Sequence, residues 1–224
     1  MKALRLLLIA MLLISISCDD DEDTPFPPPV DTQATYTAVF DAQWTPTSHP
    51  YMYPGNAHFS WMVGTTHQQQ DVMFRLGGMA TEGIEDMAET GATSMLASEL
   101  DTAILMNNAY EYKIGNVIDG DGRDEITVTA TTDHHLFSFV SMIAPSPDWF
   151  VANVNVDLMN NGDWIDSLEL DVILYDSGTD SGPTFTSSND DTVPKAPIAL
   201  IVGPPLGDGS GVNPAVGKLI LTRQ

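Results

Sequence analysis

The sequence predicts an all-β fold, an antiparallel β-sandwich with one or two short helices in a long connection. Three observations support this prediction. Short segments of alternating apolar and polar residues recur along the chain, turn-forming residues separate them, and only one stretch has a helical composition. The chain has 224 residues, of which 43% are hydrophobic. This is enough for one large folded domain.

The amino terminus has the pattern of a processing signal. Lys2 and Arg5 flank an apolar run at 6–16, which is too short for a mature transmembrane helix. Cys18 is the only cysteine and follows this run. Its position predicts a bacterial lipoprotein that is lipidated on Cys18 and held at the outer membrane or cell surface. Ser15-Ile16-Ser17 departs from the usual lipobox, so an ordinary secretory peptide remains the alternative.

A tether is predicted between this signal and the folded domain. An acidic run at 19–23 is followed by a proline-rich segment at 24–30. Like charges and prolines keep such a segment extended. The predicted organisation is therefore a signal peptide at 1–17, a tether at 18–33 and one domain at 34–224.

The folded domain begins with a clear strand pattern. Apolar residues alternate with mostly polar ones from Ala34 to Trp44, which is the period of a half-buried strand. Met73–Leu105 is rich in Ala, Glu, Met and Leu and predicts the helices. Leu136–Ile143 is almost continuously apolar, which predicts a strand buried on both faces. Further strands are expected at 58–63, 126–130, 154–158, 168–174, 198–202 and 218–222.

Two acidic turns contain the candidate binding residues. Asp148 lies in the turn Ser146–Trp149, whereas Asp176 and Asp180 lie in the turn at 175–182. If the strands beside these turns are neighbours, the three carboxylates converge at one end of a sheet. Such like charges persist when they are solvated or when they hold a cation, and oxygen ligands on loops suit Ca²⁺. The residues alone leave both interpretations open, because Asp is common in exposed turns.

Five motifs resemble the spondin domain family. They are Asn56–Ser60, Ala88–Gly91, Met142–Phe150, Asn161–Asp166 and Asp176–Gly182. The resemblance extends over about 36–197 and implies a C2-like sandwich in an extracellular adhesion or matrix setting. It also implies a Ca²⁺ site formed by Asp148, Asp176 and Asp180. The expected function is non-catalytic binding to a protein or glycan of a matrix or cell surface.

The charge balance narrows the range of partners. The formal net charge is −23. A nucleic-acid binder needs Lys and Arg to displace counterions from phosphates, so this composition disfavours nucleic acid. It also disfavours docking on anionic lipid by charge alone. Cations are the natural small partners, and a solvated secreted surface is the other explanation of the charge.

Two other functions remain as alternatives. A metal-dependent hydrolase would combine the acidic cluster with His58, His67, His134 or His135, although the chain contains no His-Glu-x-x-His motif. A Ca²⁺-bridged lipid-binding module is the second alternative. A further acidic segment at 119–125 begins like a calcium loop, but an arginine occupies a ligand position, so a hairpin turn is predicted there.

Overall fold

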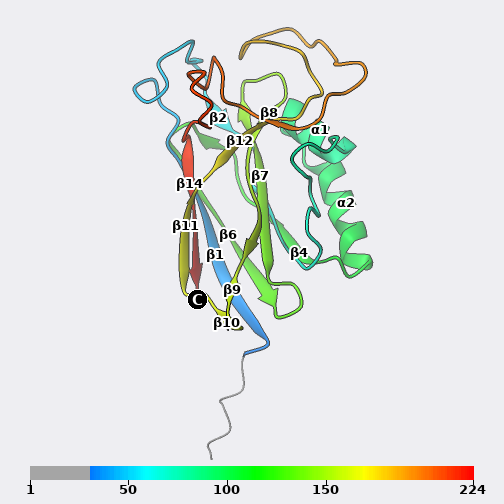
Figure 1. Cartoon of the computed structure of the whole chain (residues 1–224). Helices are drawn as coiled ribbons and strands as arrows, with labels where there is room; N and C mark the ends of the chain where they lie inside the picture. Colours follow the sequence, from blue (N-terminus) through cyan, green and yellow to red (C-terminus); the bar gives the residue numbers. More distant parts are fainter. Residues whose placement is uncertain (1–30) are drawn as a thin grey trace, which may run out of the picture. The chain divides into compact units, whose positions relative to one another are not determined.

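Two antiparallel sheets pack face to face in residues 31–224, the part of the chain that the computed structural model describes (Figure 1). The first sheet has the order β11–β14–β1–β6. Its strands are β1 (Gln33–Ala42), β6 (Arg123–Thr131), β11 (Ser167–Asp171) and β14 (Gly217–Arg223). The predicted signal peptide, Cys18 and most of the predicted tether lie outside the described residues.

The second sheet is larger and has the order β13–β12–β8–β7–β2–β5, with β3 paired to both β7 and β4. Its strands are β2 (His58–Phe59), β3 (Val63–His67), β4 (Ala109–Ile114), β5 (Ile118–Asp119), β7 (Leu136–Ala144), β8 (Trp149–Asp157), β12 (Ile173–Asp176) and β13 (Ala199–Leu200). A separate hairpin joins β9 (Met159–Asn160) to β10 (Asp163–Trp164). The prediction of an antiparallel all-β sandwich is confirmed.

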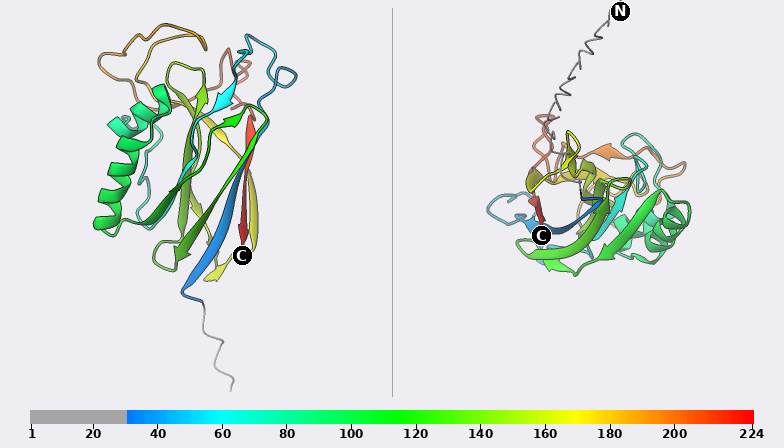
Figure 2. Two further views of the ribbon diagram at one scale, coloured as in Figure 1. Left: turned by 180° about the vertical axis from the view of Figure 1, so that it is seen from behind. Right: turned by 90° about the horizontal axis from the view of Figure 1, so that it is seen from below.

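Two helices form a third layer on the outer face of the second sheet (Figure 2). They are α1 (Glu82–Thr90) and α2 (Ser94–Leu105), within the stretch predicted to be helical. The Thr81 hydroxyl caps α1 by accepting a hydrogen bond from the Ile84 N–H, and Gly91 ends α1 with φ of 72°. Neither helix of the described region is long and apolar enough to form a transmembrane segment.

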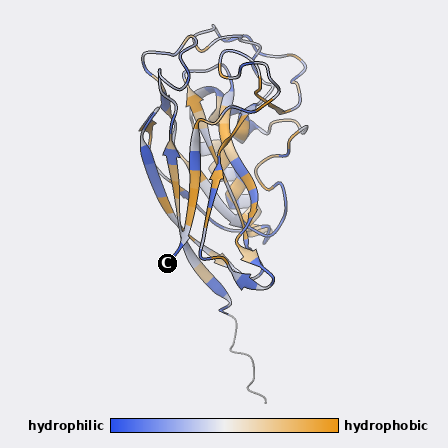
Figure 3. Cartoon of the chain, turned by 60° about the vertical axis from the view of Figure 1, so that its left-hand side comes forward, coloured by the Kyte–Doolittle hydropathy of each residue, from blue (hydrophilic) through white to orange (hydrophobic). Residues whose placement is uncertain are grey.

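Strand β7 separates two hydrophobic cores. Phe137, Phe139 and Ile143 point into the core between the sheets, whereas Val140 and Met142 pack into the core beneath the helices. All nine residues of β7 are buried, which explains the nearly continuous apolar run and confirms the prediction for this strand. Figure 3 shows hydrophobic and hydrophilic residues alternating along several other strands, as expected for strands with one buried face.

Two predicted strands are divided differently in the structure. The segment 168–174 reads as one alternating strand, but β11 pairs with β14 in the first sheet and β12 pairs with β8 in the second. The chain therefore crosses between sheets near Val172. The segment 58–63 contains all of β2 but only the first residue of β3, and both strands pair with β7.

Two further predictions are corrected by local geometry. Val154 and Val156 were expected on one face of a strand, but they pack into different cores because the register of β7 and β8 shifts beside Asn155, where φ is 57°. The segment 119–125 does contain a tight turn. Its flanking strands do not form a hairpin, however, because β5 pairs with β2 and β6 pairs with β1.

The two ends of the sandwich carry different polar groups. The acidic end, as we name it, contains the turns 145–148 and 176–182 and lies beyond the end of β7 and β12. The histidine end contains His67, His134 and His135, near the start of β7. Asp31 also lies at the histidine end, where its backbone carbonyl accepts a hydrogen bond from the Trp164 indole.

Candidate metal centre

The three predicted aspartates come together at the acidic end. Asp148 immediately precedes β8, and Asp176 is the last residue of β12. These strands are hydrogen-bonded neighbours, and Asp176 is paired with Trp149. The expectation that the two turns flank adjacent strands is therefore correct, and Asp180 follows in the loop after β12.

Asp148 organises the loop after β12. One carboxylate oxygen, Oδ2, accepts hydrogen bonds from the Thr179 N–H at 2.8 Å, the Asp180 N–H at 3.1 Å and the Ser177 hydroxyl at 3.0 Å. The Asp148 side chain is 0% exposed. Its other oxygen, Oδ1, has no hydrogen-bond partner among residues 31–224. A buried carboxylate oxygen without a partner is energetically unfavourable, so a cation, a water molecule or another donor from outside the described residues would stabilise this atom.

The other two aspartates shape the same loop through short local hydrogen bonds. Asp176 Oδ1 accepts from the Gly178 N–H at 2.9 Å, and Asp180 Oδ1 accepts from the Gly182 N–H at 2.6 Å. Such turns orient an aspartate side chain relative to its own backbone. Gly178 has φ of 76°, and a Cβ there would lie 2.2 Å from the Ala196 carbonyl oxygen. The glycine between the two aspartates is therefore required by the loop geometry.

The electrostatics of the acidic end disfavour the charged form of Asp176. Its pKa is raised to about 6, mainly because burial disfavours the ionised carboxylate and secondly because the Asp148 charge lies nearby. The Asp180 charge acts in the same direction. Hydrogen bonds from Gly178 and Trp149 act in the opposite direction and do not offset the burial. A bound cation would reverse this balance.

Glu89 is a fourth carboxylate that the sequence prediction did not include. It lies near the end of α1, and its side chain is close to Thr179, Asp148 and Asp180. Burial raises the pKa of Glu89, and the charges of Glu85, Asp180 and Asp148 add to the effect. Glu89 belongs to the family motif Ala88–Gly91, so the resemblance had pointed to it. Its position beside the aspartates, however, depends on how α1 packs.

The arrangement is not a closed metal cage. Within residues 31–224, no three His, Cys, Asp or Glu side chains, the aspartate trio included, are arranged so that they could hold a metal ion by themselves. The residues nevertheless have the chemistry that Ca²⁺ uses, namely carboxylate oxygens supplemented by backbone, hydroxyl or water oxygens on adaptable loops. Asp148 Oδ1 is the atom that fits this requirement best, because it is a buried carboxylate oxygen without a partner in the described residues.

Three of the four histidines proposed for the hydrolase alternative lie away from the acidic end. His67 is fully buried, and its Nε2 is hydrogen-bonded to the Ser138 hydroxyl at 2.8 Å. His134 contacts a backbone carbonyl through Nε2, and His135 pairs with an aspartate. Only His58, in β2, lies toward the end of β7 that leads to the aspartates.

The fold and the site together define an antiparallel β-sandwich with an acidic cluster on the loops at one end. The chain belongs to the Spondin_N family, whose profile matches residues 34–204. This confirms the family resemblance that was inferred from the five motifs.

Two relatives illustrate the extent of the match. The chain is 34% identical to human Spondin-2 over 173 residues. This aligned segment covers 75% of this chain and 52% of Spondin-2. It is 30% identical to mouse Spondin-1 over 172 residues. Here the aligned segment covers 74% of this chain and 21% of Spondin-1. The chain therefore spans about half of Spondin-2 and a smaller part of Spondin-1.

Proposed function

We propose that this chain is an extracellular, non-catalytic adhesion module that binds Ca²⁺ at its acidic end. Asp148, Asp176 and Asp180 would supply carboxylate oxygens to the ion. The observation that carries the proposal is the buried, unpartnered Oδ1 of Asp148. Membership of the Spondin_N family supports the extracellular setting.

Calcium would act here mainly as a structural element. Three converging carboxylates repel one another, and Ca²⁺ neutralises that repulsion. Because Asp148 already holds the N–H groups of Thr179 and Asp180, an ion on its other oxygen would join the turn before β8 to the loop after β12. The partner would then bind loops of fixed shape, and we expect a surface or matrix protein or glycan.

The positions of three of the four candidate histidines support a non-catalytic role. A metal-dependent hydrolase needs a base near the metal-bound water. His67, His134 and His135 instead lie at the histidine end. Their hydrogen bonds to other protein groups account for them as structural residues.

Anchoring at a membrane through Cys18 is the second part of the proposal. The apolar run at 6–16 and the single cysteine that follows it support lipidation and outer-membrane or cell-surface exposure. Mass spectrometry of the membrane fraction tests this directly. An amino-terminal Cys18 that carries a diacylglyceryl group on its sulfur is expected. An unmodified amino terminus at another position would show an ordinary secretory peptide instead.

Thermal unfolding of the full-length protein in detergent tests the calcium site. The wild type is compared with the Asp176→Ala, Asp180→Ala double variant, each in chelator and in millimolar Ca²⁺. A ligand at about 100 times its Kd stabilises the native state by about 2.7 kcal/mol, which shifts Tm by several degrees. We expect this shift in the wild type and not in the variant. Equal Tm values for the wild type in both buffers would refute the calcium site.

A further inference from the structure

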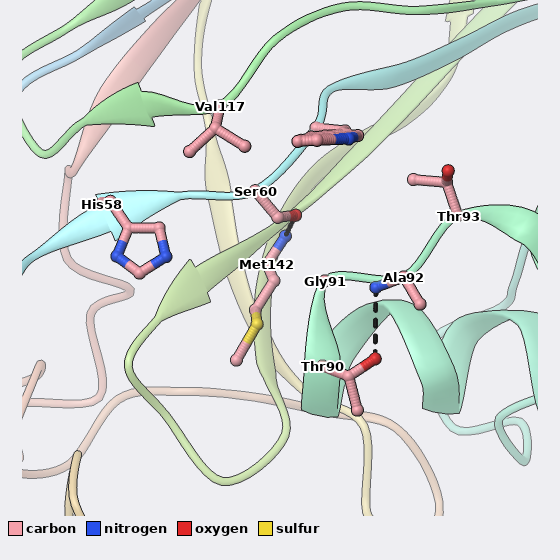
Figure 4. Close-up of a pocket in the computed structure, with 9 residues that line it drawn as sticks. His58, Ser60, Thr90, Gly91, Ala92, Thr93, Val117 and Met142 are labelled. Atoms are coloured by element: carbon pink, nitrogen blue, oxygen red, sulfur yellow. Dashed lines mark hydrogen bonds between the residues drawn. The ribbon is translucent and has the colours of Figure 1, made fainter.

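A cavity of about 350 Å³ lies between the end of α1 and strand β2. It is formed by β2 and the segment that follows it, the end of α1 and the α1–α2 loop, one residue before β5 and one residue of β7. The lining residues are His58, Ser60, Trp61, Thr90, Gly91, Ala92, Thr93, Val117 and Met142. Figure 4 shows His58 and Val117 on one side of this pocket and the residues of the α1–α2 loop on the other.

The pocket unites two motifs that the calcium proposal leaves largely unexplained. His58 and Ser60 belong to Asn56–Ser60, and Gly91 belongs to Ala88–Gly91. Gly91 has φ of +72°, and a Cβ there would lie 2.9 Å from Ser60 Cβ. The α1–α2 loop can therefore approach β2 this closely only with glycine at this position.

Hydrogen bonds fix the groups on both sides of the pocket. Ser60 Oγ accepts a hydrogen bond from the Met142 N–H at 2.9 Å, and the Ser60 carbonyl accepts one from the Ser141 hydroxyl at 2.9 Å. Across the pocket, the Ala92 N–H donates to the Thr90 hydroxyl at 3.2 Å. The pocket is therefore preformed, as small-molecule sites usually are.

The lining carries no charged side chain. This is notable in a chain with 31 Asp and Glu and 8 Lys and Arg. Trp61 is 40% exposed, whereas the other three tryptophans are at most 7% exposed. The pocket therefore offers one accessible indole surface and a neutral polar environment. A charged ligand would find no ion-pair partner among these side chains.

Hydrogen-bonding groups of both kinds surround the indole. Thr90 and Thr93, at the two ends of the α1–α2 loop, place hydroxyl groups in the lining, and a hydroxyl both donates and accepts. His58 Nδ1 is hydrogen-bonded to the Asn56 carbonyl at 2.7 Å. Because Nδ1 must be the donor there, Nε2 of the neutral ring is an acceptor.

We infer that this pocket binds a neutral saccharide. The apolar C–H face of a sugar ring would lie on the Trp61 indole, which combines a large apolar surface with low conformational freedom. The ring hydroxyls both donate and accept, so they match the Thr90 and Thr93 hydroxyls and the Nε2 acceptor of His58. An apolar side chain of a protein partner would leave those polar groups unpaired.

The proposed function leaves open whether the partner is a protein or a glycan, and this inference selects the glycan. It rests on the proposed function for its biological setting. It does not rest on bound calcium, because none of the lining residues belongs to the aspartate trio. The two proposals can therefore fail separately.

Tryptophan fluorescence of the full-length protein in detergent is the direct test. The probes are soluble neutral oligosaccharides of the glucose, galactose, mannose and N-acetylglucosamine series. Because Trp61 is the most exposed of the four tryptophans, its emission should shift when a sugar covers it. We expect saturable binding of at least one series. Loss of binding by about tenfold or more is expected for Trp61→Ala, from the lost aromatic contact.

Tyr51→Ala is the matched control. Tyr51 is an aromatic residue with 61% exposure that lines a different pocket, beside Pro204 and Pro205. This variant should bind as the wild type does. Failure of every probe to bind the wild type, or equal binding by Trp61→Ala measured by calorimetry, would overturn the inference. Saccharide binding without a calcium-dependent Tm shift would overturn the calcium proposal and leave this one standing.

Discussion

The two ends of strand β7 treat buried polar groups in opposite ways. The nine residues of β7 separate the ends by about 26 Å. At the histidine end, His67 Nε2 is hydrogen-bonded to the Ser138 hydroxyl, and Nδ1 is hydrogen-bonded to the Gln69 carbonyl. At the acidic end, charges of one sign converge and Asp148 Oδ1 has no partner within the described region.

The difference separates structural polar residues from candidate ligand-binding residues. A buried group whose hydrogen bonds are satisfied within the protein contributes to a unique fold and needs nothing from outside. A buried carboxylate oxygen without a partner destabilises the isolated protein unless a ligand arrives. The histidine end matches the first case, and the acidic end matches the second.

The largest expected effect comes from removing the carboxylate that organises the acidic end. Asp148→Ala would leave the N–H groups of Thr179 and Asp180 without their acceptor. We expect a loss of about 3 kcal/mol in the free energy of unfolding, measured by urea denaturation in chelator.

The Asp148→Asn variant distinguishes the role of Asp148 in loop stability from its role in Ca²⁺ binding. The amide keeps an acceptor oxygen for the loop but removes the negative charge. This variant should lose the calcium-dependent Tm shift while staying close to the wild-type Tm in chelator. An Asp148→Asn variant that still responds fully to Ca²⁺ would contradict the role of Oδ1.

The histidine end predicts a pH dependence of similar size. Burial lowers the pKa of His67 from 6.5 to about 4, and the nearby His134 and His135 act in the same direction. Asp71 and the hydrogen bond to Gln69 oppose the shift. The unfolded chain therefore takes up a proton at a higher pH than the folded chain does. Stability is fully present above about pH 6.5 and falls by about 3 kcal/mol as the pH decreases to 4.

Urea denaturation of His67→Gln between pH 4 and pH 7 tests this assignment. The slope of stability against pH should become clearly shallower than in the wild type. His58→Gln is the control, since His58 lies in β2 at the other end of β7. If His67→Gln keeps the wild-type slope, another group causes the acid sensitivity.

The smallest expected effect concerns Glu89. Its side chain adds negative charge beside Asp148 and Asp180, so Glu89→Gln should weaken Ca²⁺ binding by about tenfold, or about 1.4 kcal/mol. Calorimetric titration with Ca²⁺ measures the change. Glu82→Gln, at the exposed start of the same helix, should leave the affinity unchanged. Equal affinities for both variants would place Glu89 outside the site.

Sequence reasoning succeeded where one physical requirement dominates. Tyr36, Ala38 and Phe40 alternate because one face of β1 is buried, and the structure buries these residues. Asp148 and Asp176 could be predicted to lie close together, because each lies at the end of a recognisable strand and these strands are neighbours. In both cases the local pattern and the tertiary environment agree.

The failures have a common cause in tertiary contacts. Strand β3 contains Thr65, Thr66 and His67, which look exposed in sequence, yet all three are buried and hydrogen-bonded to other strands or to Ser138. The segment 168–174 keeps one alternation while it changes sheet, since Leu168 and Leu174 pack into the same core. Glu89 reaches the aspartates only through helix packing, which leaves no local pattern.

The path of β1 determines how the domain would carry force. The chain enters at Asp31, at the end of the sandwich opposite the acidic loops, and β1 runs between β6 and β14 with antiparallel pairing on both sides. Tension between Asp31 and a partner held at the acidic loops would draw β1 lengthwise past its neighbours. Its hydrogen bonds would then be loaded together in shear instead of opening one at a time, a favourable geometry for a protein that must hold on while it is pulled.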